Sequence, residues 1–409
     1  MSNRCVIIGA GHGGSQAAVS LRQEGYDGEI VLISDERDLP YHRPPLSKTF
    51  LKSSDADGLM LRAQAVYDDN RITLELGVRA DAIDVAAKTV TLSDGRVLEW
   101  SDLIIATGAR ARMPDLPGIG LAGVVTLRTI DDARTIRDKM ASAQNVAIVG
   151  GGFIGMEMAH SCRLMGKDVS LIEAAPRVLA RAVAPIVSAH VEERSRATGI
   201  DVMTGVGLEE ITGADGRATG VRLGDGRTVA ADLVVLGIGA VANVELAQDA
   251  GIQLNNGIVV DGAMRTSAPH VYAIGDCVSF EHKQSGRRLR LESVQNATDQ
   301  ARHVAAVIAG KGDDYLQVPW FWSDQGDMKL QAAGLALDTD ETIVSGEPEA
   351  NSFSVYHFAG KALVAVDSIN RPADHMIARR LLAAGISPTP QDIADGAARL
   401  KELAGSGRR

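Results

Sequence analysis

The sequence predicts an α/β fold, with two copies of one strand–helix–strand unit and a third domain of a different kind. Three observations predict it. An apolar strand at residues 5–8 and another at 145–149 each run into a glycine-rich turn and a helical segment. A similar small sheet follows both copies, and past Trp320 the pattern changes to short strands followed by helices. With 409 residues, 45% of them apolar, the chain has room for two or three domains.

The two copies repeat the same order of elements, which indicates duplication of a nucleotide-binding half. In the first copy, alternating apolar and polar residues also predict a small antiparallel sheet before a last buried strand. The elements of the first copy are expected at 5–8, 15–24 (helix), 29–33, 73–78, 82–84, 89–92 and 102–106. Those of the second are expected at 145–149, a helix through 164–165, 168–172, 207–211, 218–223, 228–230 and 233–238.

The last part of the chain is predicted to be an α+β domain. Its meander strands are expected at 331–337, 342–346, 353–357 and 362–366, and its helices at 372–384 and 390–403. Trp320 and Trp322 lie at the start of this domain, on what we expect to be a short loop, in a chain with only 4% aromatic residues. A domain-interface anchor is the alternative role for these tryptophans.

Each glycine-rich turn has the spacing G-x-G-x-x-G, as Gly9, Gly11 and Gly14 and as Gly150, Gly152 and Gly155. Such glycines let backbone N–H groups approach a pyrophosphate at the start of a helix. An acid follows the second strand of each copy, Asp35 in the first and Glu173 in the second, where it can bind ribose hydroxyls. A tight packing turn is the alternative for one such loop, but the pair predicts two dinucleotide sites.

Glu173 also favours NADH over NADPH, because a carboxylate pairs with a free 2′-hydroxyl and repels a 2′-phosphate. Arg177 and Arg181 lie close by in the sequence and could accept a phosphate.

The bulk composition excludes other classes of protein. A net charge of −10 argues against a nucleic-acid binder. Residues 1–4 lead straight into a strand with no leader, and no apolar run could span a bilayer, so we expect a cytoplasmic protein. Cys5, Cys162 and Cys277 show no paired spacing and are expected to be buried free thiols. The histidines show no metal-binding spacing.

Five segments together resemble the NADH-dependent ferredoxin reductases, most closely the branch that serves bacterial cytochrome monooxygenases. Besides the first glycine loop they are Y-H-R-P-P-L-S-K at 41–48, A-T-G at 106–108, Y-A-I-G-D at 272–276 and P-W-F-W-S-D-Q at 319–325. The resemblance covers essentially the whole chain. It implies a glutathione-reductase-type fold with two Rossmann-like dinucleotide-binding domains and an α+β C-terminal domain. The implied divisions are an FAD domain at 1–112 and 243–319, an NAD domain at 113–242 and a C-terminal domain at 320–409.

The resemblance assigns FAD to the first glycine loop and NADH to the second, and it implies a set of residues for each. Those for FAD are Gly9, Gly11, Gly14, Asp35, Arg43, Lys48, Ala106, Thr107, Gly108, Gly275, Asp276, Val294 and Trp322. Those for NAD are Gly150, Gly152, Ile154, Gly155, Glu157, Glu173 and Gly239. Lys48, Glu157 and Trp322 are the implied catalytic residues. Lys48 is expected to pair with Glu157 beside the flavin, and Trp322 to lie on the acceptor side.

Several of these residues could instead have an ordinary structural role. Asp276 could be an ordinary helix cap, and Lys48 and Glu157 could be surface charges. The polar residues 292–296, which match a family segment whose backbone touches the flavin, could instead cap a helix.

The electrons must leave through an external acceptor. Relatives that reduce disulfides carry a pair of cysteines, or a single redox cysteine, where this chain has residues 42–48, and here there is none. The implied acceptor is a [2Fe-2S] ferredoxin that serves a monooxygenase or dioxygenase. Arg302 and Lys329 are its candidate docking residues, beside a basic cluster at 283–290 that could equally be a solvated hairpin. We expect a monomer or weak dimer. The alternatives are an NADH oxidase or rubredoxin reductase, and a flavoprotein like apoptosis-inducing factor.

Overall fold

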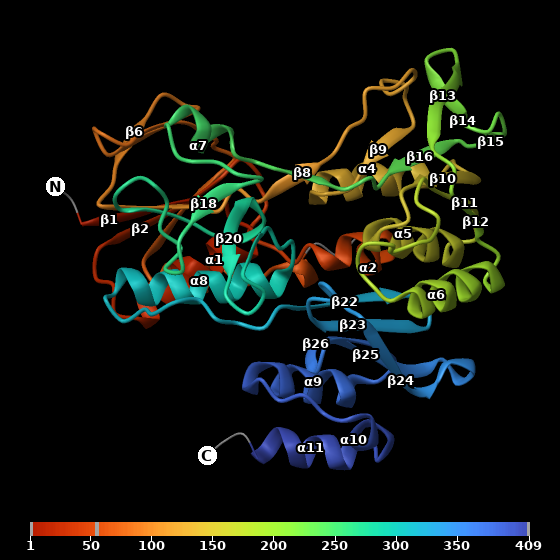
Figure 1. Ribbon diagram of the computed structural model, residues 1–409. Coiled ribbons are helices and arrows are strands. Elements are labelled where there is room, and N and C mark those ends of the chain that lie inside the picture. The colour runs from red at the N-terminus through yellow and green to blue at the C-terminus, as the bar shows by residue number, and fades with distance from the viewer. Residues whose placement is uncertain (1–2, 54–56, 407–409) are drawn as a thin grey trace. The chain divides into compact units, whose positions relative to one another are not determined.

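The computed structural model describes residues 3–53 and 57–406 (Figure 1). The chain divides into two compact units. The first consists of Met1–His42, Asp55–Arg110 and Ala240–Gln317, and the second of Arg43–Ser54, Ala111–Gly239 and Val318–Arg409. The strands β8 (Ala109–Ala111) and β17 (Ala240–Ala242) lie where the chain passes from one unit to the other. The division into three domains at 112, 242 and 319 stays a prediction.

The first unit is built on a parallel sheet with the strand order β19-β7-β1-β2-β3. These strands are β1 (Arg4–Ile8), β2 (Glu29–Ser34), β3 (Ile72–Leu76), β7 (Asp102–Ile105) and β19 (Val271–Ala273). Helices α1 (His12–Gln23) and α8 (Val294–Ile308) lie side by side (Figure 1). β1 and β7 are almost entirely buried, as expected for the central strands of a parallel sheet.

One strand of this sheet corrects the sequence prediction. Residues 73–78 were expected in an antiparallel sheet, but β3 pairs in parallel with β2, with Ile30 opposite Ile72. β3 is the edge strand, and most of its residues are only partly buried or exposed. That half-exposed position produces the alternating pattern that suggested an antiparallel sheet.

Smaller elements complete the first unit. Two three-stranded sheets have the orders β4-β5-β6 and β18-β20-β21. Their strands are β4 (Ala80–Asp84), β5 (Thr89–Leu92), β6 (Val97–Glu99), β18 (Ile258–Val260), β20 (Val278–His282) and β21 (Arg287–Leu289). The short helices are η2 (Asp57–Leu59), α3 (Gln64–Asp69), α7 (Glu245–Asp249) and η3 (Gly275–Cys277).

The second unit contains a parallel sheet of the same kind, with the order β12-β11-β10-β16-β9. Its strands are β9 (Val124–Thr126), β10 (Asn145–Val149), β11 (Asp168–Glu173), β12 (Asp201–Thr204) and β16 (Leu233–Leu236). The predicted meander is confirmed as the antiparallel sheet β13 (Leu208–Ala214), β14 (Arg217–Leu223) and β15 (Thr228–Ala230). The helices are η1 (Pro44–Ser47), α2 (Thr49–Ser53), α4 (Ile130–Met140), α5 (Phe153–Leu164) and α6 (Pro185–Ala197).

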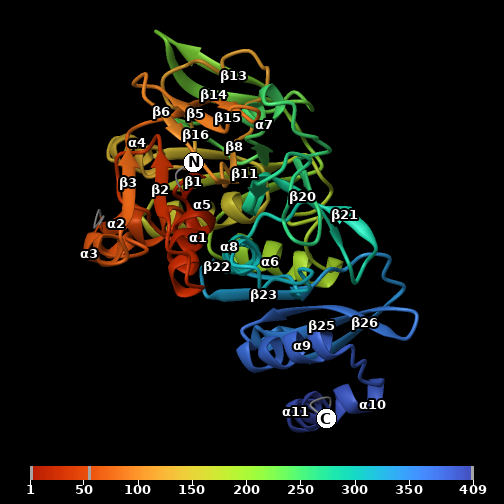
Figure 2. The same ribbon diagram turned by 90° about the vertical axis from the view of Figure 1, so that its left-hand side faces the viewer.

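An antiparallel sheet with the order β22-β23-β26-β25-β24 forms the C-terminal part of the second unit. Its strands are β22 (Trp320–Gln325), β23 (Met328–Gly334), β24 (Glu341–Glu347), β25 (Ser352–Ala359) and β26 (Ala362–Ile369). Helix α9 (Pro372–Ala384) packs on β23 and β26, and α11 (Ala397–Ser406) packs on α9 (Figure 2). The remaining short helices are η4 (Pro348–Ala350) and α10 (Pro390–Ala394).

Two details of this sheet and its helices differ from the predictions. The tryptophans were expected on a loop, but Trp320 and Trp322 lie within strand β22. The helix expected over 390–403 is two helices, α10 and α11, separated at Gly396. Gly396 has a φ of +85°, a left-handed conformation that ends a helix and that glycine adopts without a steric cost.

The predicted α/β class is confirmed: the chain contains two parallel sheets of the same kind, each with a glycine-rich turn after its central strand, and an α+β C-terminal part. Across residues 3–53 and 57–406, no helix combines the length and the apolar character needed to cross a bilayer.

Candidate functional site

The first glycine loop, residues 9–14, joins β1 to α1 and leaves space only at its tip. The Gly9 N–H donates to the Ile33 carbonyl at 2.9 Å. A Cβ on Gly9 would lie 2.3 Å from the Ala106 carbonyl oxygen, and one on Gly14 would lie 1.9 Å from the Gly9 oxygen. Gly11 instead borders open space at the N-cap of α1. A pyrophosphate can therefore approach the backbone N–H groups of the first helical turn.

The other FAD residues predicted within the first unit surround this loop. Because β19, β7, β1 and β2 are parallel neighbours, the turns that follow them meet at one edge of the sheet. The Gly275 N–H donates to Gln300 Oε1 on α8 at 2.7 Å, which ties the turn after β19 to the helix that begins at Val294. The residues gathered at this edge are Gly9, Gly11, Gly14, Asp35, Ala106, Thr107, Gly108, Gly275 and Asp276.

Of the two helix-capping roles considered as alternatives, one is absent and one is present. Asp276 lies inside η3, whose N-cap is Ile274, so Asp276 is not the cap. Ser293 does cap α8, since its side chain accepts a hydrogen bond from the Asn296 N–H.

The second glycine loop, residues 150–155, repeats this geometry in the second unit. The Gly150 N–H donates to the Ile172 carbonyl at 2.7 Å. A Cβ on Gly150 would lie 2.4 Å from the Gly237 oxygen, and one on Gly155 would lie 1.9 Å from the Gly150 oxygen, whereas Gly152 borders open space. Two separate loops thus have a crowded base and an open tip, the arrangement that a dinucleotide pyrophosphate requires.

Other predicted NAD residues lie beside this loop. Ile154, in the first turn of α5, has 42% of its surface exposed although it is apolar. Gly239 follows β16, the strand next to β10. Glu173 ends β11, and its two carboxylate oxygens accept hydrogen bonds from the N–H groups of Gly151 at 2.6 Å and Ala175 at 2.7 Å. These bonds orient the Glu173 carboxylate beside the glycine loop.

Glu157 lies on α5, one turn into the helix, and is 5% exposed. Three donors converge on its carboxylate. Lys48 Nζ is 3.0 Å from Oε1, the Ser323 hydroxyl donates to Oε1 at 2.7 Å, and the Ser47 hydroxyl donates to Oε2 at 2.5 Å. A buried charged carboxylate is stable only when it is paired and hydrogen-bonded, and the Glu157 carboxylate has both an ammonium partner and two hydroxyl donors. The ion pair that the resemblance implies is therefore present, and the surface-charge alternative does not hold for Glu157.

Local sequence explains how Lys48 reaches this position. Pro44 and Pro45 occupy the first turn of η1, where proline's fixed φ suits a helix start. The Ser161 hydroxyl, one turn beyond Glu157 on α5, donates to the Ser47 carbonyl at 2.6 Å and holds the end of η1 against α5. Lys48 Nζ also lies 3.2 Å from Asp324 Oδ2, whose side chain is 46% exposed.

Strand β22 presents different residues on its two faces. Ser323 and Phe321 face α5, where the Phe321 ring meets Phe153 edge-on at 4.6 Å between centroids. Because side chains alternate along a strand, Trp320 and Trp322 point to the other face. Their ring centroids are 5.8 Å apart. Trp322, Lys48 and Arg43, all predicted to contact the flavin, belong to the second unit.

The three cysteines are buried, as predicted. Burial raises the pKa of the Cys162 thiol to about 12, and it also raises the pKa values of Cys5 and Cys277. The reactive form of cysteine is the thiolate, so all three buried thiols differ from the exposed, low-pKa cysteines typical of redox sites.

The candidate docking cations lie near acidic residues. Arg302, on α8, pairs with Asp299 at 2.8 Å. Lys329, on β23, stands opposite Asp324 on β22. The cluster at 283–290 spans the β20–β21 hairpin, where Lys283 lies 3.2 Å from Asp314 and Arg290 pairs with Glu292. The cluster therefore lies on a hairpin, and its role in docking stays a prediction.

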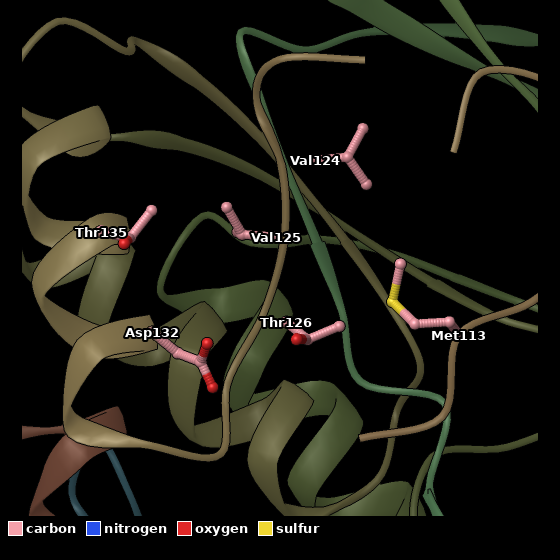
Figure 3. Close-up of a pocket in the computed structure, with 6 residues that line it drawn as sticks. All are labelled: Met113, Val124, Val125, Thr126, Asp132 and Thr135. Carbon is pink, nitrogen blue, oxygen red and sulfur yellow. The ribbon is translucent and has the colours of Figure 1, made fainter. Parts of the chain in front are cut away.

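A hollow of about 250 Å³ in the second unit lies away from this chemistry (Figure 3). It is lined by Met113, Val124, Val125, Thr126, Asp132 and Thr135. β9 is an edge strand, separated by β16 from β10 and its glycine loop. Asp132 already accepts hydrogen bonds from the backbone N–H groups of Arg128 and Thr129 as part of a helix cap. We assign the hollow no ligand.

Sequence reasoning missed three partners of the ion pair. Ser47 and Ser323 bind the Glu157 carboxylate, and Asp324 binds Lys48. All three lie inside segments that carried the family resemblance, but serine and aspartate alone give no signal of such a role. Their proximity in the sequence to Lys48 and Trp322 was the one signal that could have suggested a role at this site.

Two family models match the chain. The model for pyridine nucleotide-disulphide oxidoreductases matches residues 3–301, and the reductase C-terminal model matches residues 320–404. Among curated relatives, rhodocoxin reductase of Rhodococcus erythropolis is 44% identical over 95% of this chain and 92% of its own length. A rubredoxin-NAD(+) reductase of Pseudomonas putida is 40% identical over 90% of this chain and 96% of its own length.

Solved structures give the same result. The ferredoxin reductase for the CYP199A2 system from Rhodopseudomonas palustris superposes with a TM-score of 0.96 at 44% identity. It covers 98% of this chain and 100% of that one. The covalent putidaredoxin reductase–putidaredoxin complex gives a TM-score of 0.95 at 37% identity, covering 99% of each chain. The likeness thus extends over both units.

Proposed function

The chain belongs to the pyridine nucleotide-disulphide oxidoreductase family, whose cofactors are FAD and NAD(H), and we propose that it is an NADH-dependent ferredoxin reductase. The acceptor would be a [2Fe-2S] ferredoxin that serves a monooxygenase or dioxygenase. One NADH would then reduce two ferredoxin molecules by one electron each and leave NAD⁺ and a proton.

One observation carries this proposal: two dinucleotide cradles in a chain whose thiols are all buried. Both glycine loops are open only at the tip, so the residues present fit two pyrophosphates. The segment 42–48, where relatives that reduce disulfides carry cysteine, ends instead in Ser47 and Lys48. When bound, FAD accepts a hydride and returns its two electrons singly, so the absence of an internal disulfide favours a one-electron protein acceptor.

The first glycine loop and the turns after β2, β7 and β19 would hold FAD, with Arg43, Lys48, Val294 and Trp322 as further contacts. The second loop, with Ile154, Glu173 and Gly239, would hold NADH. Glu173 supports a preference for NADH, because its carboxylate is already fixed beside the loop by two backbone N–H groups.

Lys48 and Glu157 would be the catalytic pair. The Lys48 ammonium would supply positive charge beside the flavin, where negative charge develops on reduction. Glu157 would hold that ammonium in place and touch the nicotinamide, since its own orientation is fixed by Ser47 and Ser323. Trp322 would shield the flavin or line the path to the acceptor.

The partner is supported by the solved complex of putidaredoxin reductase with putidaredoxin, which this chain matches along its length. Arg302 and Lys329 remain candidate contacts for an acidic ferredoxin, and monomer or weak dimer remains the proposed state. A second candidate is a rubredoxin reductase, favoured by the relative of that name at 40% identity.

The test is NADH-driven reduction of cytochrome c by the FAD-loaded protein, with no carrier, with a panel of [2Fe-2S] ferredoxins or with a rubredoxin. We expect cytochrome c reduction to depend on a ferredoxin and NADPH to be a poor donor. Activity that needs no carrier would refute the proposal, and activity only with rubredoxin would establish the second candidate instead.

A further inference from the structure

A segment that the proposed function does not use connects the second glycine loop to the C-terminal sheet. We call residues 174–184, between β11 and α6, the bridging segment. At its near end the Leu179 N–H donates to the Gly151 carbonyl at 2.8 Å. The Gly151 N–H in turn donates to the Glu173 carboxylate at 2.6 Å. Both backbone groups of Gly151, which lies within the loop, are therefore hydrogen-bonded: its N–H to Glu173 and its carbonyl to Leu179.

The bridging segment is a rigid turn rather than a loose loop. Arg177 donates from its two terminal nitrogens to the carbonyls of Ala180 at 2.7 Å and Val183 at 3.1 Å. Leu179 is 3% exposed and has a φ of +52°, a conformation that a leucine keeps only when its surroundings impose it. Arg177, one of the two arginines that could have accepted a 2′-phosphate, is thus engaged in shaping this turn.

The far end of the bridging segment is fixed by a buried hydrogen-bonded histidine–aspartate pair of the C-terminal sheet. The Ala184 N–H donates to Asp367 Oδ2 on β26 at 2.9 Å. His357 Nε2, on β25, lies 2.9 Å from the same oxygen. His357 and Asp367, the anchor pair, are 3% and 2% exposed. A carboxylate buried this deeply cannot turn to solvent, so the position of Ala184 follows that of β26.

We propose that the anchor pair positions the second glycine loop and so raises the affinity of the site for the nicotinamide nucleotide. His357 and Asp367 would be positioning residues that act through Ala184, Leu179 and Gly151. This inference rests on the proposed function only in taking NAD(H) as the ligand of that loop. The C-terminal part of the chain would then contribute to binding NADH as well as to meeting the electron acceptor.

A buried pair such as His357 and Asp367 can fix the position of the bridging segment. Breaking one member would leave the other charged or polar group buried and unpaired, so the pair has no low-energy alternative arrangement. The turn that it holds is cross-linked by Arg177, so a displacement at Ala184 is carried to Leu179 instead of being absorbed. Coupling through such packed, hydrogen-bonded elements changes affinity by roughly 2- to 30-fold.

The first experiment needs no substitution. Because coupling between two sites is reciprocal, NAD⁺ bound at the loop must stabilise the bond at Ala184. Amide hydrogen exchange of the FAD-loaded protein is measured with and without NAD⁺. We expect the Ala184 amide to exchange at least threefold more slowly with NAD⁺, while amides of β24, outside the path, do not change. An unchanged Ala184 amide under saturating NAD⁺ would overturn the proposal.

The second experiment removes the acceptor while keeping the space filled. In the double variant His357→Leu/Asp367→Leu, two apolar side chains replace the pair, an exchange that buried hydrogen-bonded pairs often tolerate. We expect the Ala184 and Leu179 amides to exchange at least tenfold faster, and the Kd for NAD⁺ by titration calorimetry to rise by roughly 3- to 20-fold. Asp367→Asn keeps a carbonyl oxygen for Ala184 and should bind NAD⁺ within about threefold of the wild type.

The matched control is Ser354→Ala/Asp374→Leu. Ser354 and Asp374 are equally buried in the same part of the chain and bond to each other at 3.0 Å, with no bond to the bridging segment. This control should leave the NAD⁺ Kd and both amides unchanged. An equal loss of affinity in the control, or faster exchange without weaker binding in the anchor variant, would overturn the inference. Wild-type protein that binds no NAD⁺ would instead refute the proposed function.

Discussion

The ion pair between Lys48 and Glu157 gives the sharpest quantitative prediction. Two unit charges 3.0 Å apart attract by about 5.5 kcal/mol at an effective dielectric constant of about 20. Lys48 is 17% exposed and shares its charge with Asp324, and two serine hydroxyls remain on Glu157 if Lys48 is lost. These features reduce the net coupling, and we expect about 1.5–3 kcal/mol between the two side chains, the usual range for a hydrogen bond to a charged group.

The perturbation is a double-mutant cycle of Lys48→Met and Glu157→Gln. If the pair acts as a unit at the flavin, each single variant should slow flavin reduction by NADH by about 100-fold, which corresponds to about 2.7 kcal/mol. The double variant should be little slower than either single one, because the second substitution removes a group that has already lost its partner.

The assay is single-turnover reduction of bound flavin by NADH, followed by its absorbance, after each variant is shown to hold a full complement of FAD. The matched control is the same cycle at Arg196 and Glu192, an exposed pair on α6 with N–O distance 2.9 Å, which should leave the rate within about twofold. Single-variant losses that multiply in the double variant would refute the idea that Lys48 and Glu157 work as one unit.

Three further predictions follow from other parts of the structure. Glu173→Ala removes the carboxylate that repels a 2′-phosphate, so the preference for NADH, measured as a ratio of kcat/KM values, should fall at least about tenfold; an unchanged ratio would refute the assignment. Arg302→Gln and Lys329→Gln should each reduce the salt dependence of electron transfer to the ferredoxin, whereas Lys401→Gln on α11 should not; equal slopes in all three would exclude these docking residues. Burial, and to a smaller extent two nearby cations, lowers the pKa of His375 from 6.5 to about 4. Between these values the unfolded chain binds a proton that the folded chain does not. The free energy of unfolding is therefore highest above about pH 6.5 and falls as the pH is lowered towards 4. Between pH 7 and 4.5 the wild type should lose on the order of 2 kcal/mol of unfolding free energy through His375. The variant His375→Leu lacks this group, so its melting temperature should fall less over the same pH range. An equal fall in both proteins would count against a buried neutral histidine.

Features that depend on local pattern could be predicted from the amino-acid sequence. The two glycine loops, the acids Asp35 and Glu173 and the absence of a redox cysteine are all readable within stretches of about 30 residues. Such stretches each form one strand–helix–strand unit, whose steric requirements are imposed by neighbours along the chain. The fold class followed from the duplication of this unit. The roles of individual residues at FAD and NADH came from the family resemblance, and they stay predictions.

Features that depend on contacts between distant segments became visible only in the folded chain. Ser47 and Ser323 are 110 and 166 positions from Glu157, yet both hydroxyls bind its carboxylate. The parallel pairing of β3 was also hidden, because an edge strand with one exposed face has the same alternation as an antiparallel one. The bond from Ala184 to Asp367 spans 183 positions. A buried carboxylate must find donors wherever the fold supplies them, and no local pattern records which residues those are.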